Sequence, residues 1–112
     1  MSALSVRNWF LPLSILFMTC VWSSAALSET HTIEIKDFTF QPSSLEVNVG
    51  DTVVWINRDY APHTATATDD SWDTGNLEFK KKAKIKISET TRADYYCRYH
   101  PNMKATLIIQ NQ

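Results

Sequence analysis

The segment YYCRYHPNM, residues 95–103, decides how the rest of this chain must fold. It carries a thiol at Cys97, an imidazole at His100 and a thioether at Met103, in the pattern Cys-x-x-His-x-x-Met. A second imidazole, His63, stands far upstream. Thiol, imidazole and thioether groups are all ligands for soft or borderline metal ions. The sequence therefore predicts a fold that brings His63 to the 95–103 segment.

Each of these four residues, taken singly, has an ordinary explanation. A histidine in a loop is usually a surface residue, a methionine often only packs, and a cysteine that ends a strand is commonly a small buried apolar residue. Taken together, two histidines, one cysteine and one methionine form the ligand set of a mononuclear blue copper site. Zinc is the rival metal, but its usual ligands are thiolate, imidazole and carboxylate. The thioether of Met103 therefore favours copper.

Composition limits the classes of protein to which the chain can belong. Of its 112 residues, 44% are apolar and 21% are charged, which is ordinary for a globular chain and not for a disordered one. The formal net charge of −1 argues against nucleic acid as a partner. The length leaves room for one domain only.

The N-terminal part of the chain has the pattern of a signal peptide. Arg7 precedes an almost wholly apolar run over residues 9–22, which is too short to span a bilayer, and small residues follow at 23–26. We expect residues 1–26 to be cleaved after Ala26, with Ser28 as the second choice, and residues 27–112 to form the working domain. An uncleaved anchor is the alternative.

Cleavage would leave Cys97 as the sole cysteine, because Cys20 lies in the removed segment. An exported protein with one cysteine cannot form an internal disulfide, although its compartment is oxidising. A lone exported thiol needs another role, and metal ligation supplies one.

The remaining sequence has the two-residue alternation of β-strands. Ile33 and Ile35 alternate with polar residues, whereas Phe38 and Phe40 stand in the opposite phase, so we expect a bulge or bend near residues 36–37. Residues 69–76 read as a polar loop from which Trp72 packs back onto the body. Strands with frequent turns and no sustained helical period predict a sandwich or barrel. The expected strands are 32–36, 45–49, 52–56, 63–68, 83–87, 93–97 and 104–110.

Two segments carry a resemblance to a known family. Residues 50–58 read GDTVVWINR and are followed by Pro62 and His63, and the ligands from Cys97 to Met103 are closely spaced. Both segments resemble the cupredoxins, most closely the amicyanin subfamily and more distantly the pseudoazurins and plastocyanins. The resemblance extends over residues 32–110.

This resemblance implies a single all-β domain, the Greek-key β-sandwich of the cupredoxins. It implies that Asn57 ties the two ligand loops together and gives an N–H to the cysteine sulfur. Cupredoxins carry single electrons by cycling between Cu(I) and Cu(II), and the amicyanins pass them in the periplasm from a quinoprotein amine dehydrogenase to a c-type cytochrome. The implied ligands of one copper ion are His63, Cys97, His100 and Met103.

The chain departs from the subfamily at two positions beside the implied ligands. Tyr99 stands where amicyanins carry proline, so this chain has a backbone N–H there that could donate to the sulfur of Cys97. Asn102 is polar where the subfamily has an apolar residue, although Pro101 is retained. The second change alters the surface beside His100, so the resemblance does not assign the amine dehydrogenase of the amicyanins to this chain as its partner.

We therefore expect a monomeric, periplasmic one-electron carrier rather than an enzyme. Its partners would be redox proteins, a donor dehydrogenase and a c-type cytochrome acceptor, and the cleaved protein would not insert into a membrane. The alternative is a copper-binding module for copper delivery or storage, although delivery sites usually need open coordination. The lysines between Lys80 and Lys86 could dock an acidic partner or protect an exposed strand edge, and the sequence leaves both open.

Overall fold

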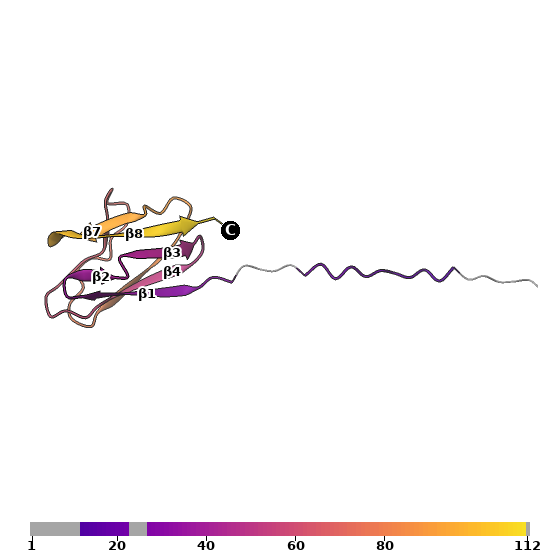
Figure 1. Cartoon of the computed structure of the whole chain (residues 1–112), viewed down its shortest axis with the longest axis horizontal. Coiled ribbons are helices and arrows are strands. Elements are labelled where there is room, and N and C mark those ends of the chain that lie inside the picture. The colour runs from indigo at the N-terminus through magenta and orange to yellow at the C-terminus, as the bar shows by residue number, and fades with distance from the viewer. Residues whose placement is uncertain (1–11, 23–26, 112) are drawn as a thin grey trace, which may run out of the picture.

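The computed structural model describes residues 12–22 and 27–111. The regular elements in this part of the chain are eight strands, which Figure 1 shows stacked in one body. Their bounds are β1 (Thr30–Lys36), β2 (Thr39–Gln41), β3 (Ser44–Asn48), β4 (Thr52–Asn57), β5 (Thr66–Ala67), β6 (Lys82–Lys86), β7 (Asp94–Cys97) and β8 (His100–Gln110).

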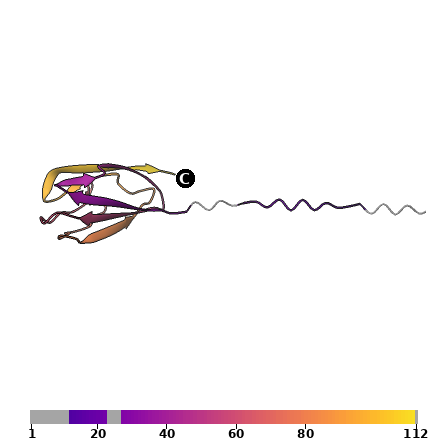
Figure 2. The ribbon, with the colours of Figure 1, turned by 60° about the horizontal axis from the view of Figure 1, so that its bottom comes forward.

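The strands form two four-stranded sheets that lie one above the other (Figure 2). One sheet has the order β2-β1-β4-β6 and the other β3-β8-β7-β5. Each contains one parallel pair, β1 with β4 and β3 with β8, and its other pairs are antiparallel. From β2 to β7 each successive strand lies in the opposite sheet. The expected all-β, single-domain Greek-key sandwich is confirmed.

The inward faces of both sheets supply the core. On β4 the burial alternates, so that Val53 and Trp55 are completely buried while their neighbours are half-buried. The ring of Trp55 lies 5.2 Å from that of Trp72 and 5.4 Å from that of Tyr95, measured between centroids. The expectation that Trp72 packs back onto the body is therefore confirmed. Such aromatic pairs contribute about 0.5–1.5 kcal/mol each beyond their buried area.

A two-residue hairpin turn explains the change of phase between the isoleucines and the phenylalanines. Strand β1 ends at Lys36, which pairs with Thr39 of β2, and Asp37 and Phe38 make the turn. Both turn residues have positive φ, 52° and 57°, as the turn types that suit tight hairpins require. The turn resets the register, so that Phe40 points into the core and is only 2% exposed.

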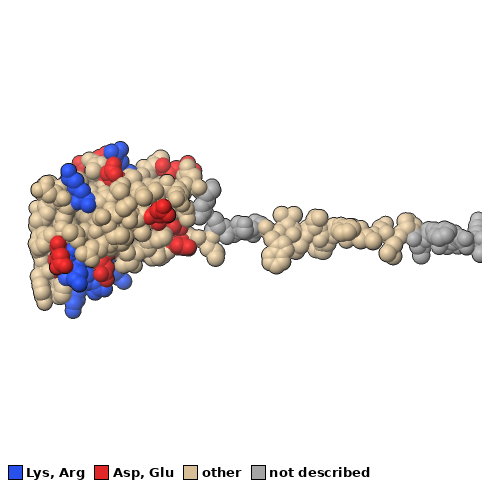
Figure 3. Space-filling view, viewed as in Figure 1, with Lys and Arg blue, Asp and Glu red and all other residues tan. Residues whose placement is uncertain are grey.

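The lysines that the sequence singled out lie on and before an edge strand. Strand β6 is the last of its sheet, and Lys82, Lys84 and Lys86 are all exposed on it. Lysines on an edge strand hinder pairing with another chain. On the face that Figure 3 shows, basic and acidic side chains are interspersed rather than gathered into one large area of a single sign.

Residues 12–22, the first segment that the structure describes, are all exposed and belong to no strand or helix. Within the described part of the chain, no helix is both long and apolar enough to cross a membrane. The expected cleavage point after Ala26 lies outside the described residues.

Candidate metal centre

Three of the four predicted ligands meet at one end of the sandwich. Cys97 ends β7 and His100 begins β8, and the two residues are paired across a tight turn. His63 lies just before β5, which is the neighbour of β7 in the sheet. The ligand atoms of His63, Cys97 and His100 all lie within 4.8 Å of one another, and they are the only such group of histidine, cysteine and acidic residues in the described chain.

Both imidazoles turn the same nitrogen toward the sulfur. The Cys97 Sγ atom lies 3.8 Å from Nδ1 of His63 and 3.6 Å from Nδ1 of His100. Cys97 and His63 are completely buried, whereas His100 is partly exposed. The centre is therefore enclosed by protein and approaches the surface through the His100 ring.

Met103 is brought to the same end of the molecule by β8. It is 6% exposed and belongs to the apolar cluster that includes Cys97. Together with Phe38 and Phe40 it lines a groove of about 390 Å³ between the β1–β2 hairpin and β8. The sequence placed His100 and Met103 in a loop, but β8 begins at His100, so both stand on a strand.

The hydrogen bond to the cysteine sulfur comes from a residue that the sequence analysis missed. The backbone N–H of Thr64 donates to Cys97 Sγ over 3.4 Å. Asn57, which was expected to supply this bond, instead donates its side-chain amide to the carbonyls of Ala61 and Leu77, over 2.9 and 2.8 Å. Its backbone N–H is used as well, by the Lys81 carbonyl. Asn57 therefore holds the segment that leads to His63, not the cysteine side.

The backbone N–H of Tyr99 does not donate to the sulfur of Cys97 either, although the sequence suggested that it could. Tyr99 sits at the tip of the turn between Cys97 and His100 and is 49% exposed. Among the described residues, Thr64 is the only one whose backbone N–H donates to Cys97 Sγ. Pro101 follows His100 and is exposed beside it on β8.

A polar network fastens the cysteine turn to the loop after β5. The Arg98 guanidinium donates to Asp73 over 2.7 Å and to Asp70 over 2.9 Å. The Arg98 backbone N–H donates to the hydroxyl of Thr64 over 2.9 Å, and that hydroxyl also bonds with Thr66. Burial alone would raise the pKa of Asp73, but the N–H of Gly75 and the Arg98 guanidinium hold it below its ordinary value.

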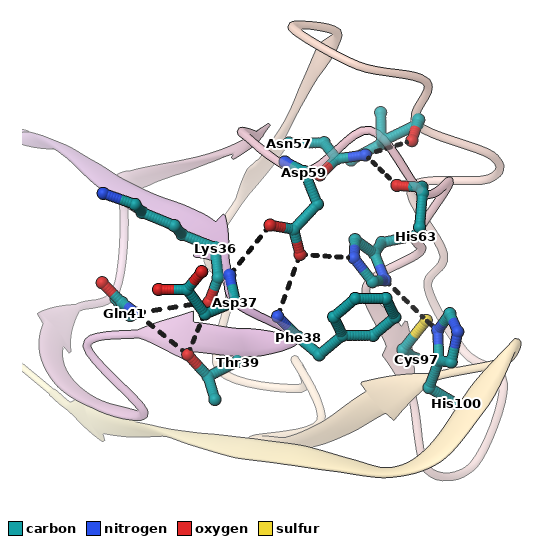
Figure 4. A network of polar contacts seen from close by, with 12 residues as sticks. Lys36, Asp37, Phe38, Thr39, Gln41, Asn57, Asp59, His63, Cys97 and His100 are labelled. Carbon is teal, nitrogen blue, oxygen red and sulfur yellow. Dashed lines mark hydrogen bonds and ion pairs between the residues drawn. The ribbon is translucent and has the colours of Figure 1, made fainter.

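A carboxylate also touches the first histidine from the side away from the sulfur. Asp59 Oδ2 lies 2.8 Å from Nε2 of His63 and accepts the backbone N–H of Phe38, while Oδ1 accepts that of Asp37 (Figure 4). Burial alone would raise the pKa of Asp59, but the N–H of Phe38 and the His63 imidazole hold it below its ordinary value. Asp59 and His63 are only four residues apart, but no sequence pattern pointed to their contact. The contact of Asp59 with Asp37 joins residues that are 22 apart in the sequence.

The donor set fits copper better than zinc. One thiol and two imidazoles converge, and Met103 lies buried at the same end. The carboxylate of Asp59 is bound to the outer nitrogen of His63 and does not belong to the converging group. Thiolate, two imidazoles and a thioether suit a metal that cycles between Cu(I) and Cu(II).

Comparisons with known proteins agree with this geometry. The family model described as "Cupredoxin-like domain" matches residues 9–109. Amicyanin of Paracoccus denitrificans is 30% identical over 83 residues, which cover 70% of this chain and 63% of that protein. This chain thus spans less than two thirds of the length of that relative.

Solved structures of the same fold include amicyanin variants. The Cu(I) form of one variant superposes with a TM-score of 0.65 at 26% identity, covering 78% of this chain and 87% of that one. A reduced variant gives 0.63 at 26% identity, with 72% and 82% covered. A copper-containing nitrite reductase from Thermus scotoductus shares the fold at 23% identity and a TM-score of 0.65, covering 79% of this chain but only 23% of that one.

Proposed function

Because this chain belongs to the cupredoxin-like family, whose model covers residues 9–109, we propose that it is a blue copper electron carrier. One copper ion is held by the side chains of His63, Cys97, His100 and Met103. The observation that carries this proposal is the convergence of three ligand atoms within 4.8 Å, from two segments that are far apart in the sequence. When bound there, copper supplies one-electron oxidation and reduction.

The chain's own residues prepare this centre. Cys97 must lose its proton to act as a ligand, because the thiolate is the metal-binding form, so binding releases a proton. The N–H of Thr64 stabilises the negative sulfur from the side. Complete burial of Cys97 and His63 excludes water, and the partly exposed His100 ring is the edge through which an electron reaches a partner.

Metal titration and voltammetry test this function together. Copper should saturate at one ion per chain, and the loaded protein should give one reversible one-electron wave. Replacing the weak axial ligand, in Met103→Gln, should keep part of the colour and lower the potential. A protein that binds only Cu(I) and stays colourless would instead be a copper delivery or storage module.

We place the protein in the periplasm, with residues 1–26 removed after export. Its proposed role is that of a monomeric carrier rather than an enzyme, which takes electrons from a dehydrogenase and gives them to a c-type cytochrome. The likeness to the nitrite reductase does not argue for enzyme activity, since the match covers only 23% of that chain. Mass spectrometry of the protein recovered from the periplasm should find Leu27 as the first residue.

A further inference from the structure

Three hydrogen-bond donors converge on the single carboxylate of Asp59 (Figure 4). The backbone N–H of Asp37 donates to Oδ1 over 2.8 Å, and that of Phe38 donates to Oδ2 over 2.9 Å. The Nε2 atom of His63 lies 2.8 Å from the same Oδ2. The Asp59 side chain is 12% exposed and that of His63 is fully buried. Asp59 thus joins the β1–β2 turn to the first imidazole of the metal centre.

The turn that Asp59 holds has an unfavourable backbone. Asp37 and Phe38 both have positive φ, 52° and 57°, a region that residues other than glycine rarely enter. For a bulky residue such as Phe38 this conformation is costly, and it persists only where the surroundings enforce it. The two bonds from the turn to Asp59 are contacts that enforce it.

The ring that this turn presents lies against both imidazoles. The Phe38 ring stands edge-on to His63, with 5.0 Å between centroids, and edge-on to His100, with 4.9 Å. The same ring lines the groove beside Met103. The Phe38 ring therefore separates that groove from the imidazole rings of His63 and His100.

Hydrogen-bond roles fix the tautomer of His63. An ionised carboxylate can only accept hydrogen bonds, so Nε2 of His63 must be the donor to Asp59. The proton then sits on Nε2, and Nδ1 keeps its lone pair, directed at the Cys97 sulfur 3.8 Å away. Histidine ligands in metal sites commonly have their second nitrogen bound to a carboxylate in this way.

We propose that Asp59 is a positioning residue of the metal centre. It fixes the tautomer and ring orientation of His63 and holds the Phe38 ring against both imidazoles. This role rests on the proposed metal centre. The role also predicts the tautomer of His63 in the metal-free protein, which can be tested without copper.

The first test is the long-range ¹H–¹⁵N histidine spectrum of metal-free, ¹⁵N-labelled protein at about pH 8, above the ordinary imidazole pKa. The wild type should show His63 as the Nε2–H tautomer. The Asp59→Asn variant should show a mixture, because an amide nitrogen replaces one of the two accepting oxygens. A wild-type His63 in the Nδ1–H form overturns the proposal, whether or not the variant folds.

The second test compares affinity for Cu(I), measured by competition with a chelator. Loss of an outer partner of a ligand histidine typically weakens metal binding about 10–100-fold, and Asp59→Asn should do so. The matched control is Asp51→Asn. Asp51 also accepts two backbone N–H groups, from Glu29 and Asn48, and contacts an imidazole nitrogen, that of His31, but it precedes β4, whereas Asp59 follows it.

The control variant should keep the wild-type affinity although it loses the same kind of bonds. Equal affinities in Asp59→Asn and the wild type would overturn the positioning role. Failure of the wild type itself to bind copper would contradict the proposed function, and the metal-free spectrum would then decide the role of Asp59 by itself.

Discussion

The backbone N–H of Thr64 donates a hydrogen bond to the sulfur of Cys97 over 3.4 Å, so the chain immediately after His63 is tied to the thiol of β7. The same residue accepts the backbone N–H of Arg98 through its hydroxyl over 2.9 Å. Thr64 therefore bonds to the cysteine turn twice, once as donor and once as acceptor. This explains how two ligand segments that are remote in sequence keep a common register.

Replacing Thr64 by valine should destabilise the metal-free protein. Valine keeps the shape but leaves the partly buried Arg98 N–H without its acceptor, and the loss of this hydrogen bond should cost about 1 kcal/mol. Urea unfolding measures the change. The control is Thr106→Val, whose hydroxyl donates to the exposed Asp94, and its effect should stay within about 0.5 kcal/mol. Equal losses in the two variants would contradict the role given to the Thr64 hydroxyl.

Stability should fall in acid because of Asp51. The N–H groups of Glu29 and Asn48, together with the His31 imidazole, hold the pKa of Asp51 below its ordinary value. A carboxyl whose pKa is lower in the folded than in the unfolded chain stabilises the fold above the unfolded pKa, about 3.9. That stability is lost as the pH falls through the folded pKa.

The free energy of unfolding of the metal-free protein should therefore decline below about pH 4. Asp51→Asn should be less stable at neutral pH and should show a shallower decline. The exposed Glu89 provides the control, since Glu89→Gln should leave the wild-type curve unchanged. A curve for Asp51→Asn parallel to that of the wild type would show that Asp51 does not contribute to acid unfolding.

Phe38→Gly should open the metal centre without destroying the turn. Glycine adopts positive φ without strain, so the hairpin should remain while the ring that touches both imidazoles is lost. Azide added to the copper-loaded variant should then change its visible spectrum, whereas the wild type should resist. Asp37→Gly alters the backbone in the same way but keeps the ring, and should also resist. If both variants responded to azide alike, the ring would not be the barrier.

Tyr99→Pro and Tyr99→Phe should have nearly the same reduction potential. The proline variant loses the Tyr99 backbone N–H and the phenylalanine variant keeps it, but the described hydrogen bond from backbone to sulfur comes from Thr64. Voltammetry of the two variants makes the comparison. A drop of about 59 mV in the proline variant alone, a tenfold shift in a one-electron equilibrium, would mean that the Tyr99 N–H does act on the sulfur.

Local pattern was enough to predict much of the fold. Alternation placed Ile33 and Ile35 inward, and β6 forms where lysine alternates with isoleucine and alanine. These predictions succeed because side chains on a strand alternate between its two faces whatever the partner strand is. The same reasoning overestimated the strand at 63–68, of which only Thr66–Ala67 is a strand.

Contacts between distant segments could not be predicted in this way. Strand β8 starts at His100 rather than at 104 because its pairing with β7 continues up to the turn. Phe38 became part of the site only when the β1–β2 turn met Asp59 in the segment before His63. The ligand spacing near Cys97 was readable in the sequence, but its surroundings depend on the assembled sheets.

The most direct test of the whole account is the visible spectrum of Cu(II)-loaded wild type beside that of Cys97→Ser. The intense colour of a blue site requires copper bonded to a thiolate, and Cys97 is the sulfur on which both imidazoles converge. We predict an intensely blue wild type and a variant that has lost this colour. A colourless wild type, or a Cys97→Ser protein that stays blue, would contradict the account.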